Sequence, residues 1–284
     1  MRSEELKEKI RPKKALGQNF LTDRNVVVRI AQLVERGPDA RILEVGPGRG
    51  ALTRLLAEEG ARVVAVELDR QLVPLLEKEF AGAGNVEIVQ ADILRTDLPD
   101  LLQPRWTGSW QVAANLPYNI STPVLFRFLE HRALFSRLVL MLQKEVGERL
   151  VAHPCTKEYG ILSVFFQLYF DITRAFTVKP GSFHPVPKVD SVVLTFVPLP
   201  APRYEVVDEP FFRRVVKAAF GQRRKTLWNC LKSLEMGLDD RELSQALAGC
   251  GIDGVRRGET LTLEEFVALS EALTGVTPAG KRLE

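Results

Sequence analysis

The chain has 284 residues, of which 45% are hydrophobic and 26% are charged, and its formal net charge is +3. This composition is typical of a soluble globular protein, and with so small a net charge any affinity for nucleic acid must come from local clusters of basic residues. Residues 1–14 contain no apolar core, which excludes a signal peptide, and no apolar run approaches the roughly 20 residues that a membrane span needs. We therefore expect a cytoplasmic protein without membrane contact.

Short apolar segments alternate with helical patterns along the first part of the chain. Strands are predicted at 41–45, 62–68, 86–92, 110–115 and 136–143. Helices are predicted between them, at 51–60, 69–82, 122–130 and 144–151, and Asp69 is expected to be the N-cap of the second. Strands that alternate with helices in this way form βαβ units. The pattern therefore predicts an α/β fold with a parallel, doubly wound sheet.

The pattern changes after the strand-like segment "DSVVLTFVPL". Residues 200–210 contain three prolines, and only helical periodicity follows them, at 211–220, 226–234, 240–247 and 262–273. We therefore predict two domains, an α/β domain over residues 1–204 and a small all-helical domain over residues 205–284.

Three predicted strands end in residues that suit a nucleoside. Gly46 and Gly48 lie in "EVGPGRGAL", where glycines let backbone N–H groups approach a ligand at the end of a strand. Glu67 ends the second strand, where a carboxylate can accept both hydroxyls of a ribose. Asp92 ends the third strand and can accept a hydrogen bond from an exocyclic amine. These residues do not distinguish NAD from S-adenosylmethionine, and a purely structural glycine turn remains an alternative.

The segment "NLPY", Asn115–Tyr118, favours methyl transfer to an amine. The exocyclic amine of a purine is a poor nucleophile because its lone pair is delocalised into the ring. The Asn115 side-chain carbonyl and the Leu116 backbone carbonyl can accept its two hydrogens and bias the nitrogen toward tetrahedral geometry. Pro117 fixes the turn, and Tyr118 offers a face on which a base can stack. Orientation and electrostatics can then support the reaction without a strong base. The alternative interpretation of this segment is a capped turn before a helix.

Basic residues cluster in the second predicted domain. Residues 211–234 contain seven Lys or Arg residues and no acidic residue, namely Arg213, Arg214, Lys217, Arg223, Arg224, Lys225 and Lys232. A stretch of one charge suits a phosphate backbone. A second basic segment, "KIRPKK", covers residues 9–14. A solvated basic helix is the alternative.

The sequence resembles the KsgA family of small-subunit ribosomal RNA adenine dimethyltransferases. The shared motifs are "KKALGQNFL", "LEVGPGRGALT", "VEL", "ADIL", "NLPYNIST", "GSFHPVPKVDS" and "FGQRRKTLWN", and they span nearly the whole chain. "NLPY" also occurs in large-subunit rRNA methylases, whereas "FGQRRKTL" and "SFHPVPKVDS" favour the small-subunit branch.

The resemblance implies a Rossmann-like S-adenosylmethionine-dependent methyltransferase domain over residues 1–204, with an N-terminal lid over 1–25, and a helical RNA-binding domain over 205–284. The cofactor residues that it implies are Gln18, Asn19, Leu21, Gly46, Gly48, Glu67, Leu68, Asp92, Ile93 and Asn115. The catalytic residues are Asn115, Leu116, Pro117, Tyr118 and Phe183, and Tyr118 and Phe183 would sandwich an adenine flipped out of its helix. RNA would contact Arg223, Arg224, Lys225, Lys13 and Lys14.

The implied activity is dimethylation of the N6 amines of two adjacent adenines near the 3′ end of small-subunit (16S) rRNA, with a role in small-subunit biogenesis. The implied partner is the small ribosomal subunit, and we expect a monomer. We expect no metal ion, because the three histidines and three cysteines share no ligand spacing. The alternatives are a large-subunit rRNA or DNA adenine methylase, and a ribosome-assembly factor that acts mainly by binding RNA.

Overall fold

The computed structural model describes residues 11–234 and 238–276. These residues group into two compact units. The first comprises the chain up to Gly147 together with Asp171–Pro198, and the second comprises Glu148–Phe170 together with the chain from Leu199 onward. This grouping differs from the predicted boundary after residue 204 because residues 148–170 join the C-terminal helices. Residues 1–10 of the predicted lid, and with them the start of the basic segment 9–14, lie outside the described residues.

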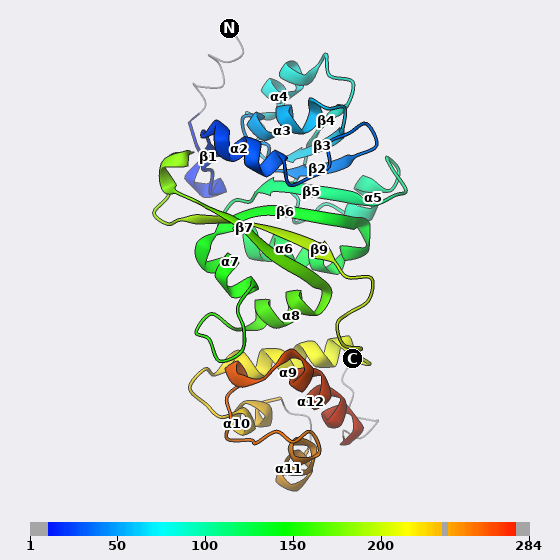
Figure 1. The fold of residues 1–284 in the computed structure, drawn as a ribbon, viewed down its shortest axis with the longest axis vertical. Helices are drawn as coiled ribbons and strands as arrows, with labels where there is room; N and C mark the ends of the chain where they lie inside the picture. The colour runs from blue at the N-terminus through cyan, green and yellow to red at the C-terminus, as the bar shows by residue number, and fades with distance from the viewer. Residues whose placement is uncertain (1–10, 235–237, 277–284) are drawn as a thin grey trace. The chain divides into compact units, whose positions relative to one another are not determined.

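A seven-stranded sheet forms the centre of the first unit, with strand order β4-β3-β2-β5-β6-β9-β7 (Figure 1). Its strands are β2 (Arg41–Val45), β3 (Arg62–Glu67), β4 (Val86–Gln90), β5 (Trp110–Asn115), β6 (Phe135–Gln143), β7 (Phe170–Val178) and β9 (Ser191–Pro198). The strands from β2 to β6 pair in parallel as predicted, whereas β9 is antiparallel to β6. A separate antiparallel pair joins β1 (Phe20–Leu21) to β8 (Phe183–His184).

Helices connect these strands. They are α2 (Arg24–Ala31), α3 (Ala51–Ala57), α4 (Val73–Phe80), α5 (Leu98–Leu102), α6 (Ser121–Glu130) and α7 (Lys144–Leu150), with 3₁₀ turns η1 (Lys14–Leu16), η2 (Arg132–Leu134) and η3 (Pro180–Ser182). The four predicted helices correspond to α3, α4, α6 and α7. The prediction of Asp69 as an N-cap is wrong, because α4 begins at Val73 and its N-cap is Leu72.

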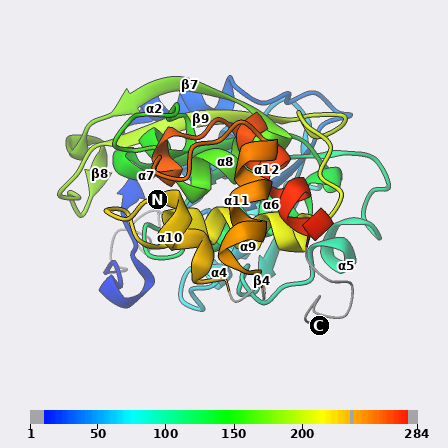
Figure 2. The same cartoon turned by 90° about the horizontal axis from the view of Figure 1, so that it is seen from below.

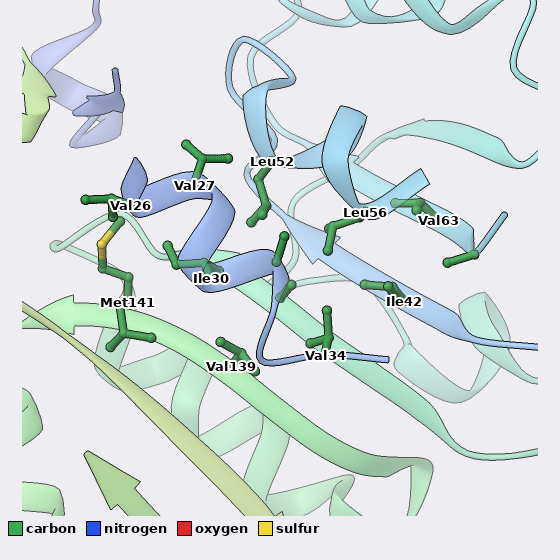
Figure 3. Close-up of a cluster of buried hydrophobic side chains, with 14 of the residues drawn as sticks. Val26, Val27, Ile30, Val34, Ile42, Leu52, Leu56, Val63, Val139 and Met141 are labelled. Carbon is green, nitrogen blue, oxygen red and sulfur yellow. The ribbon is translucent and has the colours of Figure 1, made fainter. Parts of the chain in front are cut away.

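Apolar side chains cover both faces of the sheet. On one face, residues of α2 and α3 such as Ile30 and Leu56 pack against alternate strand residues such as Ile42 (Figure 3). The intervening residues Leu43 and Val64 point to the opposite face and are also buried. A parallel sheet covered on both sides needs nearly continuous apolar strands, which is why these strands were predictable.

The second unit is helical, as predicted for the C-terminal part of the chain. It contains α8 (Ile161–Tyr169), α9 (Glu209–Gly221), α10 (Leu227–Lys232), α11 (Asp240–Gly249), η4 (Gly258–Thr260) and α12 (Leu263–Val276), the last four helices drawn from yellow to red in Figure 2. Its core includes the ring pairs Phe165–Phe212 and Phe220–Phe266, with centroids 6.2 Å and 5.6 Å apart. Within the described residues, no helix combines the length and the apolar character needed to cross a bilayer.

The strand order reverses between β2 and β5, since β3 and β4 follow on one side and β6 on the other. At such a switch point the connecting helices leave on opposite faces, and a ligand crevice opens outside the carboxyl ends of the strands. Gly46, Glu67, Asp92 and Asn115 all lie at or just after carboxyl ends of strands in this region. The topology therefore gathers the predicted site residues at one edge of the sheet.

Candidate active site

A cavity lies at this edge of the sheet, with an empty space of about 1160 Å³ when its open mouth is included. Concave sites of this kind, lined by apolar side chains with a few convergent polar groups, are where proteins bind small ligands and cofactors. Every predicted cofactor residue lines the cavity, and so do the predicted catalytic residues Asn115–Tyr118. Lining residues that were not predicted include Phe20, Glu44, Arg49 and Asn119.

The glycine turn after β2 depends on left-handed backbone conformations. Gly46 and Gly48 have φ angles of +70° and +58°, which glycine adopts without the steric cost of a Cβ. A Cβ on Gly48 would also lie only 3.1 Å from the Phe20 ring. At Gly46 and Gly48, therefore, no side chain lies between the backbone and the cavity.

Glu67 is held in place by two backbone donors. Its Oε1 accepts from the Asp69 N–H at 2.8 Å and its Oε2 from the Gly48 N–H at 3.1 Å. The residue is only 6% exposed, and burial raises the pKa of its carboxyl although the backbone hydrogen bonds oppose this. Each oxygen keeps a lone pair, so the carboxylate can accept two further hydroxyls from a bound ribose.

A second carboxyl group, Glu44 of β2, also lines the cavity. It is 2% exposed, and its Oε2 has no hydrogen-bond partner among the described residues. Burial raises its pKa to about 8; a hydrogen bond with Thr53 opposes the shift and the nearby Glu67 adds to it. Glu44 is therefore largely neutral at pH 7. The acidic residue inside the apolar strand "RILEV" was the sequence signal that could have revealed it.

Asp92 follows β4 and lines the cavity, as Leu68 and Ile93 also do. Its Oδ1 accepts from the Leu94 N–H at 3.0 Å, and its Oδ2 lies 3.7 Å from Arg95 Nε. The loop thus fixes the carboxylate while leaving acceptor capacity for the amine of an adenine.

The amide of Asn115 has a defined orientation. Its Nδ2 donates to the Asn19 carbonyl at 3.1 Å, and its Oδ1 accepts no hydrogen bond from any described residue. The Leu116 N–H donates to the Met141 carbonyl at 3.2 Å, which ties the start of the motif to β6. Asn115 therefore presents an unused acceptor to a ligand in the cavity.

Tyr118 is anchored through its hydroxyl group, which lies 2.6 Å from Ser191 Oγ at the start of β9. Ser121 Oγ donates to the Tyr118 carbonyl at 3.2 Å. Burial raises the pKa of the phenol, although the hydrogen bond with Ser191 opposes this, so Tyr118 stays protonated at neutral pH. The ring is thereby fixed as a neutral stacking surface.

Phe183 does not line the cavity. It lies in β8 opposite Leu21, is 2% exposed, and packs in the apolar core with α2 residues such as Val26. The structure thus places Phe183 in the core and not among the residues that line the cavity, and its contact with a target adenine stays a prediction.

The predicted RNA contacts Lys13 and Lys14 differ in their surroundings. Lys13 Nζ lies 2.6 Å from Asp69 Oδ1, and Gln18 Nε2 donates to Asp69 Oδ2 at 2.8 Å. Burial alone would raise the pKa of Asp69, but the hydrogen bonds from Lys13, the Gln71 N–H and Gln18 outweigh it and lower that pKa. Lys13 thus has a partner within the chain, whereas Lys14 is exposed.

The basic residues 223–225 of the second unit are also not equivalent. Arg223 Nε lies 3.2 Å from Glu259 Oε2, and its NH2 group donates to the Lys157 carbonyl at 2.7 Å. Arg224 and Lys225 are exposed and have no side-chain partner among the described residues. Arg223 is thus already engaged by groups of its own unit, whereas Arg224 and Lys225 are not.

The part of the chain that the structure describes contains no group of three His, Cys, Asp or Glu residues arranged to hold a metal ion. Its cysteines form no disulfide.

Comparison with known families decides the assignment. The family model for ribosomal RNA adenine dimethylases matches residues 9–274. This chain belongs to that family. Among curated relatives of this rRNA adenine dimethylase, the ribosomal RNA small subunit methyltransferase A of Geobacter metallireducens is 66% identical over 266 residues, covering 94% of this chain and 97% of that protein. The protein of the same name from Bacillus cereus is 46% identical over 265 residues, covering 92% and 91%.

Solved structures agree with this assignment. A dimethyladenosine transferase from Plasmodium falciparum superposes with a TM-score of 0.72 at 24% identity, covering 88% of this dimethylase and 95% of that chain. The 23S rRNA methyltransferase ErmE superposes with a TM-score of 0.68 at 27% identity, covering 90% and 100%. These structures confirm the predicted Rossmann-like methyltransferase fold, and the family match with the curated relatives confirms the prediction of an rRNA methyltransferase.

Proposed function

We propose that this dimethylase transfers methyl groups from S-adenosylmethionine to the N6 amines of two adjacent adenines near the 3′ end of small-subunit rRNA. The observation that carries the proposal is the Asn115 amide, which is oriented by the Asn19 carbonyl and keeps its oxygen free at the cavity that Glu67 and Asp92 also line. The 66% identity to a small subunit methyltransferase, against 27% to a 23S rRNA methyltransferase, supports the small subunit as the target.

The cavity residues fit S-adenosylmethionine. Glu67 would accept the two ribose hydroxyls, Asp92 would accept from the adenine amine, and the bare turn at Gly46–Gly48 would admit the methionine part. When bound, the cofactor supplies a methyl group activated by a positively charged sulfur. The chain's own residues then have to hold the cofactor and exclude bulk water.

The target amine would be activated by acceptors and not by a strong base. Asn115 Oδ1 and the Leu116 carbonyl would accept its two hydrogens, which localises the nitrogen lone pair toward the methyl group. Tyr118, fixed by Ser191, would stack on the adenine. The methylated amine is cationic and loses a proton readily to water, so orientation and electrostatics supply the rate enhancement. A second round needs only that the monomethylated amine rotate in the same site.

RNA binding would use Arg224 and Lys225, whose side chains are exposed and free of partners within the described residues. An rRNA substrate also implies that the protein acts in the cytoplasm. A role in small-subunit biogenesis is part of the same proposal.

The test offers purified small and large ribosomal subunits that lack the modification, together with labelled S-adenosylmethionine, and then maps the modified nucleotides. We expect N6,N6-dimethyladenine at two adjacent positions near the 3′ end of small-subunit rRNA. Label in the large subunit would instead support the function named for ErmE. If Asn115→Ala, which keeps the RNA-binding residues, fully restored growth and subunit maturation to a deletion strain, RNA binding would outweigh catalysis.

A further inference from the structure

Residues 13–21, here called the strap, run along the cavity from one of its sides to the other. At one side, Lys13 and Gln18 contact Asp69, which follows β3. At the other side, Asn19 contacts Asn115 at the end of β5. Between these points, residues 16–21 line the cavity. The strap is therefore attached on both sides of the cavity that it lines.

The attachment at Asp69 is a closed ring of polar contacts. The Asp69 side chain is fully buried, with 0% exposure, and its Oδ1 accepts from Lys13 Nζ at 2.6 Å and from the Gln71 N–H at 3.0 Å. Its Oδ2 accepts from Gln18 Nε2 at 2.8 Å, and Gln18 Oε1 in turn accepts from the Lys13 N–H at 2.8 Å. Detachment would remove the Lys13 and Gln18 donors and leave the buried carboxylate with the Gln71 N–H alone, which favours the attached strap.

The second attachment connects the strap to the side-chain amide of Asn115. Gly17 has a φ angle of +63°, and a Cβ on it would lie 2.3 Å from Asn119 Oδ1, so the backbone packs tightly against the loop after β5. The Gly17 carbonyl accepts from Asn19 Nδ2 at 3.3 Å, and the Asn19 carbonyl accepts from Asn115 Nδ2. A shift of the strap therefore moves the acceptor that orients Asn115.

We propose that Asp69 and Lys13 are positioning residues that hold the strap over the bound cofactor and, through Asn19, set the orientation of the Asn115 amide. Neither residue lines the cavity, so they act through Gln18 and Asn19 and not by touching the substrates. The inference rests on the proposed cofactor and on the proposed role of Asn115. It assigns Lys13 to the cofactor site and not to RNA.

The test measures S-adenosylmethionine binding to the full-length protein without RNA, by calorimetry and by stopped-flow dissociation. Lys13→Gln removes one charge from the attachment. Arg70→Gln is the matched control, because Arg70 is exposed next to Asp69 and its side chain makes no hydrogen bond or ion pair with any described residue. We expect Lys13→Gln to raise the dissociation rate about tenfold, the control to leave it unchanged, and Lys13→Arg to restore it.

A double-mutant cycle with Asp69→Asn measures the coupling between Lys13 and Asp69, apart from the effect of each single substitution. In Lys13→Gln/Asp69→Asn no buried charge is left unpaired, so the combined loss of affinity should be smaller than the sum of the single losses. If Asp69→Asn does not fold, Lys13→Gln and its control still decide the question, because Lys13 lies at the more exposed end of the pair.

The link to Asn115 is tested by single-turnover methylation of small subunits at saturating cofactor. We expect the single-turnover methylation rate of Lys13→Gln to fall severalfold even at saturating cofactor. A loss of cofactor affinity alone would not lower the rate under this condition. A dissociation rate equal to that of Arg70→Gln would overturn the proposal. Failure of the proposed function appears separately, as wild-type protein that binds S-adenosylmethionine but methylates no small-subunit rRNA.

Discussion

Glu67→Gln is the most direct test of the cofactor site. The substitution keeps the size of the side chain but removes its charge. Both carboxylate oxygens accept a backbone N–H, from Asp69 at 2.8 Å and from Gly48 at 3.1 Å. A glutamine amide must turn its NH₂ group toward one of these donors, so one contact becomes donor against donor.

The expected loss follows from these contacts. A hydrogen bond to a charged group contributes about 1.5–3 kcal/mol, and about 1.4 kcal/mol corresponds to a tenfold change in affinity. The glutamine oxygen can still accept one ribose hydroxyl, so about one such bond is lost. We therefore expect the dissociation constant for S-adenosylmethionine to rise about tenfold to a hundredfold, with the fold retained.

The assay is isothermal calorimetry with S-adenosylmethionine from about pH 8 down to about pH 5, with Glu58→Gln as an exposed control. Burial raises the pKa of Glu67 above its ordinary value, and the ionised form is the stronger acceptor. Wild-type affinity should therefore fall as the pH is lowered through that raised pKa, whereas Glu67→Gln should show no such fall. Equal affinity in Glu67→Gln, or a pH profile parallel to that of the wild type, would remove Glu67 from the ribose site.

Three further outcomes are expected. Asn115→Ala should lower the single-turnover methylation rate about a hundredfold or more while rRNA affinity stays within a few fold, since one aligned polar group at a reacting centre has an effect of this size. Combined Arg224→Ala and Lys225→Ala should flatten the slope of log affinity against log salt by about 1.4–1.8, because each phosphate contact contributes about 0.7–0.9; Arg223→Ala should mainly lower the melting temperature. Glu44→Gln should raise the free energy of unfolding increasingly from pH 4.5 to about pH 8, because wild-type Glu44 ionises in the unfolded chain while it stays protonated in the folded one.

Each outcome has a counterpart that would contradict it. Near wild-type transfer by Asn115→Ala would exclude its oxygen as the acceptor for the target amine. An unchanged salt slope for the Arg224 and Lys225 variant in filter binding would mean that other residues meet the phosphates. A constant difference between Glu44→Gln and wild type across the pH range, in urea unfolding, would show that Glu44 is ionised in the folded protein.

Much of the site was predictable because it follows strand ends. Parallel strands bring their carboxyl ends to one edge of the sheet, so Gly46, Glu67, Asp92 and Asn115 could be grouped from the sequence alone. The strands themselves are nearly continuous apolar runs, as burial on both faces requires. Local pattern and strand direction together were sufficient for these residues.

Contacts between distant segments were not predictable. The pair of Lys13 and Asp69 spans 56 residues, and without it Lys13 reads as part of a basic segment and Asp69 as a helix cap. The motif resemblance placed Phe183 on a target adenine, whereas the pairing of β8 with β1 puts it opposite Leu21 and in the core. The antiparallel direction of β9 is likewise absent from its own apolar pattern, because strand direction is set by the connection and not by composition.

The division of the second unit between two stretches of chain has a consequence for synthesis. Helix α8 carries buried apolar residues such as Val164 and Phe166, and its Phe165 packs against Phe212 of α9, which the ribosome adds 47 residues later. At about 5–20 residues per second, synthesis of these residues takes about 2–10 s, during which α8 lacks this partner. The nascent chain therefore contains the apolar face of α8 before its partner α9 has been synthesised, and the second unit cannot be completed in a single pass along the chain.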